Sequence, residues 1–209
     1  MEITCGHTAC QCCHGALRYI RTARRHPIGL MLGRPRVRLK YQECKRCGRV
    51  DPLDAYYQNV PPKGNYAYDV IVEVGLARFR DRRQDEEIQR MLEERWRLTV
   101  PADTIGLLAD SFLDGLAAVH QAHVSTLRQK LSEEGGYIMH VDGTCEADTD
   151  VLFTAIAEPH GWILETAKMT SENQTEIIKM LSSCVQKFGV PQAVVRDLSP
   201  NIAAAVAQV

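Results

Sequence analysis

Residues 137–143 read YIMHVDG and residues 192–197 read QAVVRD, two apolar runs that each end on or beside an aspartate. Between them, VLFTAIAEP and WILETAKM flank the turn Pro159-His160-Gly161, a pattern typical of a β-hairpin. Ser171-Glu-Asn-Gln174 is a capping box, so we expect a helix that begins there and ends before Gly189. QAVVRD then predicts a buried strand, and Ser199-Pro200 predicts the start of another helix. The order is β-β-β-α-β-α.

The two aspartates, Asp142 and Asp197, follow the first and the fourth of these strands. A right-handed helical crossover can place the fourth strand parallel beside the first. Both carboxylates would then lie at the same edge of the sheet, where Mg²⁺ could neutralise them and serve phosphodiester chemistry. The alternative is structural: each aspartate closes its strand, because Asp-Gly and Asp-Leu-Ser are common ways for a turn to begin.

The middle of the chain has a helical pattern. Residues 50–65 carry three prolines and predict a linker. Helical spacing begins at Asp69, although DVIVEVGLARF also alternates like a strand, and it is clearer over Gln84–Trp96 and from Pro101 to about Leu131. Two helices around a tight turn predict a helix-turn-helix, with its groove-facing end at Ala102, Asp103, Thr104 and Gly106. Two packed helices that connect domains are the alternative.

Six of the eight cysteines fall within residues 1–47. Cys10-Gln-Cys-Cys13 and Cys44-Lys-Arg-Cys47 are CxxC turns with thirty residues between them, the spacing of a zinc ribbon with two antiparallel strands. We expect these four cysteines to hold one Zn²⁺. Cys5, His7 or His14 could replace one of them, and free thiols in a disordered arm are the alternative to a metal site.

The charge is strongly asymmetric along the chain. Residues 1–50 hold 11 Lys and Arg against 2 Asp and Glu, whereas residues 132–209 hold 4 against 11. A basic surface binds phosphate backbones without reading sequence, but basic ribbons also bind RNA or proteins, so this feature alone does not name DNA. The family resemblance given below implies double-stranded DNA as the partner. The candidate DNA-binding residues are Arg18, Arg21, Arg24, Arg25, Arg34, Arg36, Arg38 and Lys40.

No stretch reaches the roughly 18 apolar residues that a membrane span requires, and no basic region followed by an apolar run opens the chain. We therefore expect a cytoplasmic protein with no membrane partner.

The stretches HVDGTCE, LETAKMTSEN and FGVPQAVVRDLSPNIAAAV resemble the ribonuclease-H-like core of bacterial insertion-sequence transposases of the DDE type. The resemblance implies an α+β multidomain protein: a zinc ribbon (1–50), a linker (51–68), a helix-turn-helix-like region (69–134) and a partial ribonuclease-H-like α/β domain (135–209). It implies that Asp142 and Asp197 are the first two catalytic acids, that Zn²⁺ is a cofactor together with Mg²⁺ at the aspartate pair, and that the activity is DNA recombination by transposition.

The family's third acid is a Glu on a later helix, and the 12 residues that follow Asp197 contain no acid. Glu176 on the preceding helix is a weak substitute. We expect a transposase front portion that binds DNA but is catalytically incomplete. An active enzyme whose third carboxylate comes from a downstream segment or a partner is one alternative, and a DNA-binding repressor or scaffold is another. The open sheet edge predicts a homo-oligomer or a covering partner protein.

Overall fold

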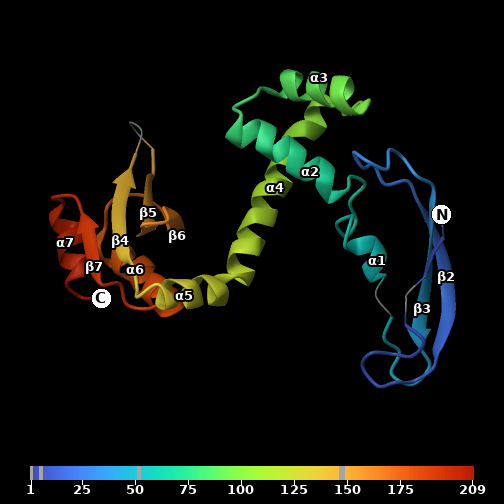
Figure 1. Ribbon diagram of the computed structural model, residues 1–209, viewed down its shortest axis with the longest axis horizontal. Coiled ribbons are helices and arrows are strands. Elements are labelled where there is room, and N and C mark those ends of the chain that lie inside the picture. The colour runs from blue at the N-terminus through green and yellow to red at the C-terminus, as the bar shows by residue number, and fades with distance from the viewer. Residues whose placement is uncertain (1, 5–6, 51–52, 146–148) are drawn as a thin grey trace. The chain divides into compact units, whose positions relative to one another are not determined.

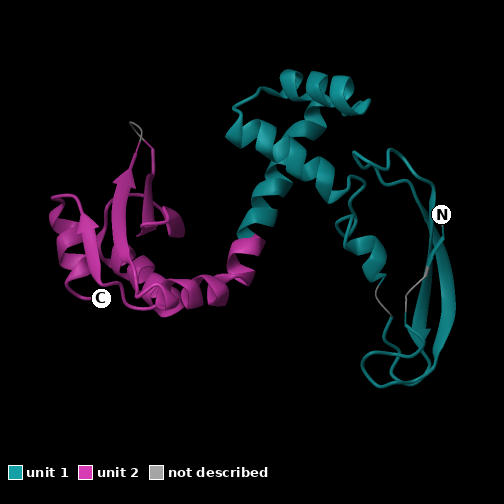
Figure 2. Cartoon of the chain, viewed as in Figure 1, with its two compact units in different colours: residues 1–117 teal, residues 118–209 magenta. Residues whose placement is uncertain are grey.

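The computed structural model describes residues 2–4, 7–50, 53–145 and 149–209. Within them the chain is α+β, with two separate sheets (Figure 1). It divides into two compact units, residues 1–117 and 118–209, and the boundary falls inside helix α4 (Ala102–Ala122) (Figure 2). No helix in the described residues is both long and apolar enough to cross a bilayer.

The first sheet has the order β1-β3-β2. Strands β2 (Leu17–Arg25) and β3 (Val37–Cys44) are antiparallel, as the segment between the two CxxC turns predicts. Strand β1 (Glu2–Thr4) adds to the other side of β3 in parallel, which the sequence pattern did not indicate. Along β3, Val37 and Leu39 are buried while Arg38 between them is exposed, so this sheet has one covered and one open face.

The covered face packs against the segment that we expected as a linker. Leu53, Tyr56 and Val60 are buried there together with Val37 and Leu39. Helix α1 (Asp54–Tyr57) holds Tyr56 in place, and the hydroxyl of Tyr57 lies 3.1 Å from that of Tyr41 on β3. Residues 53–60 therefore contribute to the small core of the hairpin instead of only connecting two parts of the chain.

The helical part of the first unit contains α2 (Tyr68–Gly75), the π-helical segment η1 (Leu76–Arg80), α3 (Asp85–Trp96) and α4. The strand alternative for DVIVEVGLARF is thus wrong, because Val70, Ile71 and Val74 share the buried face of a helix. The bounds of α3 agree with the periodicity. Helix α3 ends at its C-cap Arg97, which has the left-handed conformation with φ 54°. The side-chain amide of Gln89 in α3 donates a hydrogen bond to the carbonyl of Val100 (2.7 Å).

The long helix expected from Pro101 to about Leu131 is two helices, α4 and α5 (Val124–Glu133). The break lies at His123, whose ring nitrogen Nδ1 bonds the carbonyl oxygen of Val119 at 2.8 Å. A side chain that takes up a helical carbonyl competes with the regular backbone ladder. The regular helix is interrupted at His123, between the end of α4 and the start of α5.

The second sheet has the order β6-β5-β4-β7. Strands β4 (Ile138–Thr144), β5 (Val151–Glu158) and β6 (Trp162–Met169) form an antiparallel meander, and β7 (Ala193–Arg196) lies parallel to β4. The predicted β-β-β-α-β-α order is confirmed. Alternate residues of β5 are buried, and Phe153, Ala155 and Ala157 share one core with residues of α5, α6 (Gln174–Phe188) and α7 (Pro200–Val206).

Two local expectations in this unit are wrong. The cap of α6 is Asn173, not Ser171, because the Asn173 side chain accepts a hydrogen bond from the backbone N–H of Thr175 (2.8 Å). Strand β7 is largely exposed instead of buried, and Val195 keeps 46% of its surface. The physical reason is that β7 is the edge strand and pairs only with β4.

Candidate metal centre and carboxylate pair

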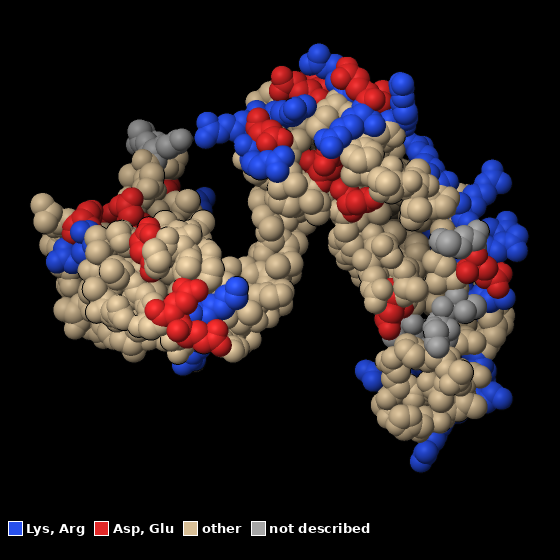
Figure 3. All heavy atoms as spheres, viewed as in Figure 1, with Lys and Arg blue, Asp and Glu red and all other residues tan. Residues whose placement is uncertain are grey.

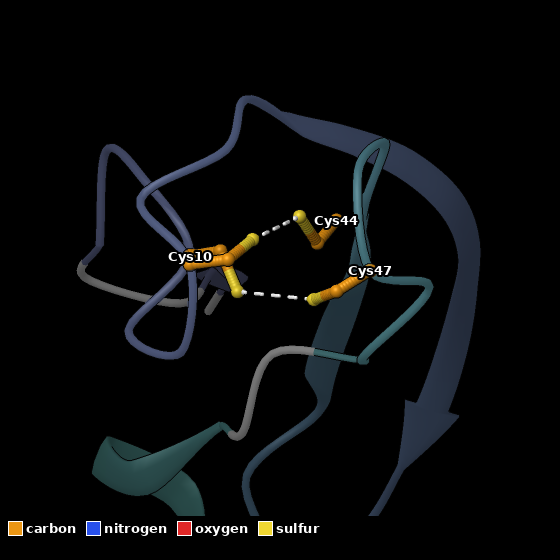
Figure 4. A group of neighbouring side chains, drawn as sticks. Cys10, Cys44 and Cys47 are labelled. Atoms are coloured by element: carbon orange, nitrogen blue, oxygen red, sulfur yellow. Dashed lines mark hydrogen bonds between the residues drawn. The ribbon is translucent and has the colours of Figure 1, made fainter.

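The four expected cysteines form the only group of three or more potential metal ligands found in the described residues. The Sγ atoms of Cys10, Cys13, Cys44 and Cys47 all lie within 4.8 Å of one another. Cys10 and Cys47 are 3.7 Å apart, and Cys13 and Cys44 are 3.4 Å apart. Figure 4 shows the sulfurs of Cys10, Cys44 and Cys47 turned toward one another. All four are free thiols, so no disulfide joins them.

These distances match a tetrahedral metal site. A Zn–S bond is about 2.3 Å, so two sulfurs of a tetrahedral shell lie about 3.8 Å apart, whereas a disulfide would bring them to about 2.05 Å. The four cysteines could therefore hold one metal ion with small adjustments, a geometry compatible with zinc and with a zinc ribbon.

The two CxxC turns have the same backbone conformation. In the first, the N–H of His14 donates to Cys10 O and that of Cys10 to Gly15 O; in the second, Gly48 N–H donates to Cys44 O and Cys44 N–H to Arg49 O. The residue after each second cysteine has a positive φ, 56° at His14 and 71° at Gly48. His14 thus occupies the position that glycine occupies in the other turn.

The turns also approach each other closely. The N–H of Lys45 donates to the carbonyl of Ala16 at 2.9 Å. A Cβ atom on Gly15 would lie 2.9 Å from Cys44 Sγ and 3.3 Å from Cys13 Sγ, tighter than almost any real contact. Gly15 is therefore the residue that lets the first turn lie against the second.

Backbone amides around the cluster favour a thiolate at Cys44. Hydrogen bonds from the N–H groups of Cys47 and Arg46 lower the pKa of Cys44 to about 6, against the opposing effect of burial. The N–H of Arg49 acts the same way on Cys47, but contact with the neighbouring thiols and burial outweigh it and raise the pKa of Cys47 to about 12. Thiolates crowded at this distance need a cation, because they repel one another in its absence.

Among the described residues, the alternative ligands His7 and His14 do not join this cluster. His14 is exposed, and His7 lies beside the side-chain amide of Gln11, 2.5 Å from its Nε2. Cys5 lies outside the described residues. Cys12, inside the first turn, is exposed and not part of the four-cysteine group.

The eight candidate DNA-binding residues all lie on or next to the hairpin. Arg18, Arg21, Arg24 and Arg25 are on β2, Arg38 and Lys40 are on β3, and Arg34 and Arg36 precede β3. Several already have partners inside the protein. Arg18 contacts Glu43 at 3.5 Å, and the Arg21 guanidinium lies 4.6 Å from the centre of the Tyr41 ring.

Asp142 and Asp197 occupy equivalent places on neighbouring strands. The last register pair of β4 and β7 is Val141 opposite Arg196, so the two aspartates are the next residues on each strand. Both are exposed. Asp197 Oδ1 accepts a hydrogen bond from the N–H of Ser199 (2.9 Å). This bond closes the turn after β7, which is the structural role that the Asp-Leu-Ser sequence predicts for Asp197. The topology thus brings both residues to one edge of the sheet.

Glu172, rather than Glu176, is the glutamate beside this edge. Its Oε2 accepts a hydrogen bond from Ser199 Oγ (2.9 Å), and its Oε1 would lie 2.8 Å from a Cβ added to Gly143, the residue after Asp142. Glu176 is exposed and lies 3.8 Å from Lys179. The carboxylate oxygens of Asp142, Asp197 and Glu172 do not form a group within 4.8 Å in the described residues. Glu146 and Asp148 lie outside them.

A scan against models of known protein families and a search of the curated proteins each found no match to this chain.

Proposed function

We propose that the chain is a zinc-containing DNA-binding protein of the insertion-sequence transposase type. One observation carries the proposal: a hairpin whose base is held by four clustered cysteines presents eight basic side chains. Zn²⁺ on Cys10, Cys13, Cys44 and Cys47 would fix the two turns, and the hairpin would bind the phosphate backbone of duplex DNA. The short turn between α3 and α4 supports a helix-turn-helix contribution.

The second unit supports the transposase assignment. Its β4–β7 pairing puts Asp142 and Asp197 at adjacent strand ends, where a hydrated Mg²⁺ could bind. Two-metal phosphoryl transfer needs enough carboxylates to hold both ions about 3.5–4 Å apart. Because no third carboxylate joins the pair in the described residues, we propose that this chain by itself binds DNA without cutting it.

Duplex binding by the zinc-loaded full chain tests the first part of the proposal. We expect affinity to fall steeply with salt, by about 0.9 log units per log unit of salt for each neutralised phosphate. Cys44→Ser should abolish zinc binding and weaken duplex binding. Cys12→Ser changes a thiol that lies inside the first CxxC turn but outside the four-cysteine group, and it should change neither. Failure of the zinc-loaded chain to bind duplex at low salt would refute the proposal.

A nicking assay with Mg²⁺ or Mn²⁺ tests the second part. We expect no metal-dependent cleavage by the purified chain. Cleavage that disappears in Asp142→Asn and Asp197→Asn would show instead that the active site is complete, and Glu172→Gln against Glu176→Gln would then identify the third ligand.

A further inference from the structure

A basic cleft of about 660 Å³ lies at the end of the hairpin formed by the last residues of β2 and the first of β3. Its lining residues are Glu2, Arg24, Arg25, His26, Arg36, Val37 and Arg38. Four arginines thus surround the cleft against a single acid. Basic side chains gather along the β2–β3 part of the chain, as the blue spheres of Figure 3 show.

The cleft is separate from the cysteine cluster. Strand β3 begins at Val37 beside the cleft and ends at Cys44 in the cluster. At a rise of about 3.3 Å per residue, these seven steps separate the two sites by about 23 Å. A ligand in the cleft would therefore not touch the proposed metal ligands, and changes in the cleft leave the cysteines in place.

Two of the arginines that line the cleft face each other across the sheet. Arg24 on β2 lies directly opposite Arg38 on β3, and like charges in this position destabilise a sheet. Among the described residues, the side chain of Arg24 makes no hydrogen bond or ion pair. Glu2, the one acid of the lining, is bonded to Lys40 and lies opposite Arg38 in the register of β1 and β3, and both cations lower the pKa of Glu2. An anion between Arg24 and Arg38 would remove this repulsion.

The other basic residues of the hairpin contrast with this pair. Arg18 contacts Glu43, Arg21 lies over the Tyr41 ring, and Arg34 donates to the carbonyl of Thr99 (3.1 Å). Their side chains are already engaged, so a ligand gains less from them. The side chain of Arg24 has no such partner among the described residues, and Arg38 shares the one nearby acid, Glu2, with Lys40.

Resting on the DNA-binding function proposed above, we infer that this cleft is the principal phosphate-binding site of the hairpin and takes backbone phosphates of duplex DNA. No Phe, Tyr or Trp is among its described lining residues. Proteins that bind single strands use such rings as stacking platforms for unpaired bases, so the lining favours a duplex, whose bases are already stacked. The phosphates of a small free molecule share the same chemistry and must be separated by experiment.

The experiment compares two double variants of the full chain that each remove two charges from β2–β3. The first variant, Arg24→Gln with Arg38→Gln, removes the two opposed arginines of the cleft. The second variant, Arg18→Gln with Arg21→Gln, removes two arginines of the same hairpin that already contact other side chains. We expect the first to lower the log–log salt slope of duplex binding by about 2, and the second by less than about 1. Zinc content and circular dichroism establish that both variants are folded. Removing the opposed pair relieves the repulsion between Arg24 and Arg38 and leaves Glu2 its bond to Lys40.

The outcomes separate the two proposals. Equal salt slopes for the two variants, with strong duplex binding by the unmodified chain, would refute the cleft as the principal phosphate-binding site but would still support the DNA-binding function. No duplex binding by the unmodified chain would overturn both. Inorganic pyrophosphate, added at constant ionic strength, tests for small phosphates. The cleft is a site for small phosphates if pyrophosphate raises the melting temperature of the unmodified chain but not of the cleft variant, and if the two double variants have equal salt slopes of duplex binding. A single strand of equal length that binds with the same dependence on Arg24 and Arg38 would overturn the duplex assignment.

Discussion

Replacing Gly15 by alanine perturbs the closest approach of the two CxxC turns. The added Cβ would lie 2.9 Å from both Cys44 Sγ and Arg46 Cβ, whereas ordinary contacts begin at 3.4 Å, so each neighbour must move by about 0.5 Å. Metal–ligand distances tolerate only about 0.2 Å of deviation. Overpacking of this kind typically costs about 1–3 kcal/mol, which corresponds to roughly 5-fold to 150-fold in an equilibrium constant.

We therefore expect Gly15→Ala to weaken zinc affinity within that range, measured by competition with a chromogenic chelator. Gly106→Ala is the control, because a Cβ at Gly106, within α4, meets no atom within 4 Å. It adds the same methyl group far from the thiols and should leave zinc affinity unchanged. Unchanged affinity in Gly15→Ala would refute the close approach of the two turns at the cluster.

Three further predictions concern single positions. His14→Gly should keep full zinc content because φ is 56° there, while His14→Val should weaken zinc binding; loss of zinc in His14→Gly would make His14 a ligand. Gly75→Ala should lower the thermal stability of the first unit, because its Cβ would lie 2.0 Å from the Phe112 ring; an unchanged melting temperature in calorimetry would contradict this packing. Asn173→Ala should cost about 1 kcal/mol in urea unfolding, and Ser171→Ala much less; equal losses would restore the capping box at Ser171.

The sequence allowed most of the second unit to be predicted because its signals are local. Alternating burial from Val151 to Ala157 and the turn at Pro159 indicate the hairpin directly. The exposure of Val195 could not be predicted in the same way. An apolar run looks identical in a central and in an edge strand, and only the pairing with β4 decides which it is.

The cysteine cluster was predictable because CxxC spacing already restricts where two thiols can point. The conformation of His14 was not, because histidine rarely adopts a positive φ and only comparison with Gly48 makes the equivalence visible. The position of Glu172 was not predictable either, since its proximity to Gly143 depends on how the chain before α6 packs against the sheet. The burial of Leu53 and Tyr56 is likewise a tertiary effect that three nearby prolines conceal.

X-ray absorption at the zinc edge of the purified full chain tests the central claim most directly. With zinc content measured on the same sample, we predict one Zn²⁺ per chain with four sulfur neighbours at about 2.3 Å. Absence of zinc, or a shell that includes nitrogen or oxygen neighbours at about 2.0–2.1 Å, would contradict the assignment of Cys10, Cys13, Cys44 and Cys47 as the complete ligand set.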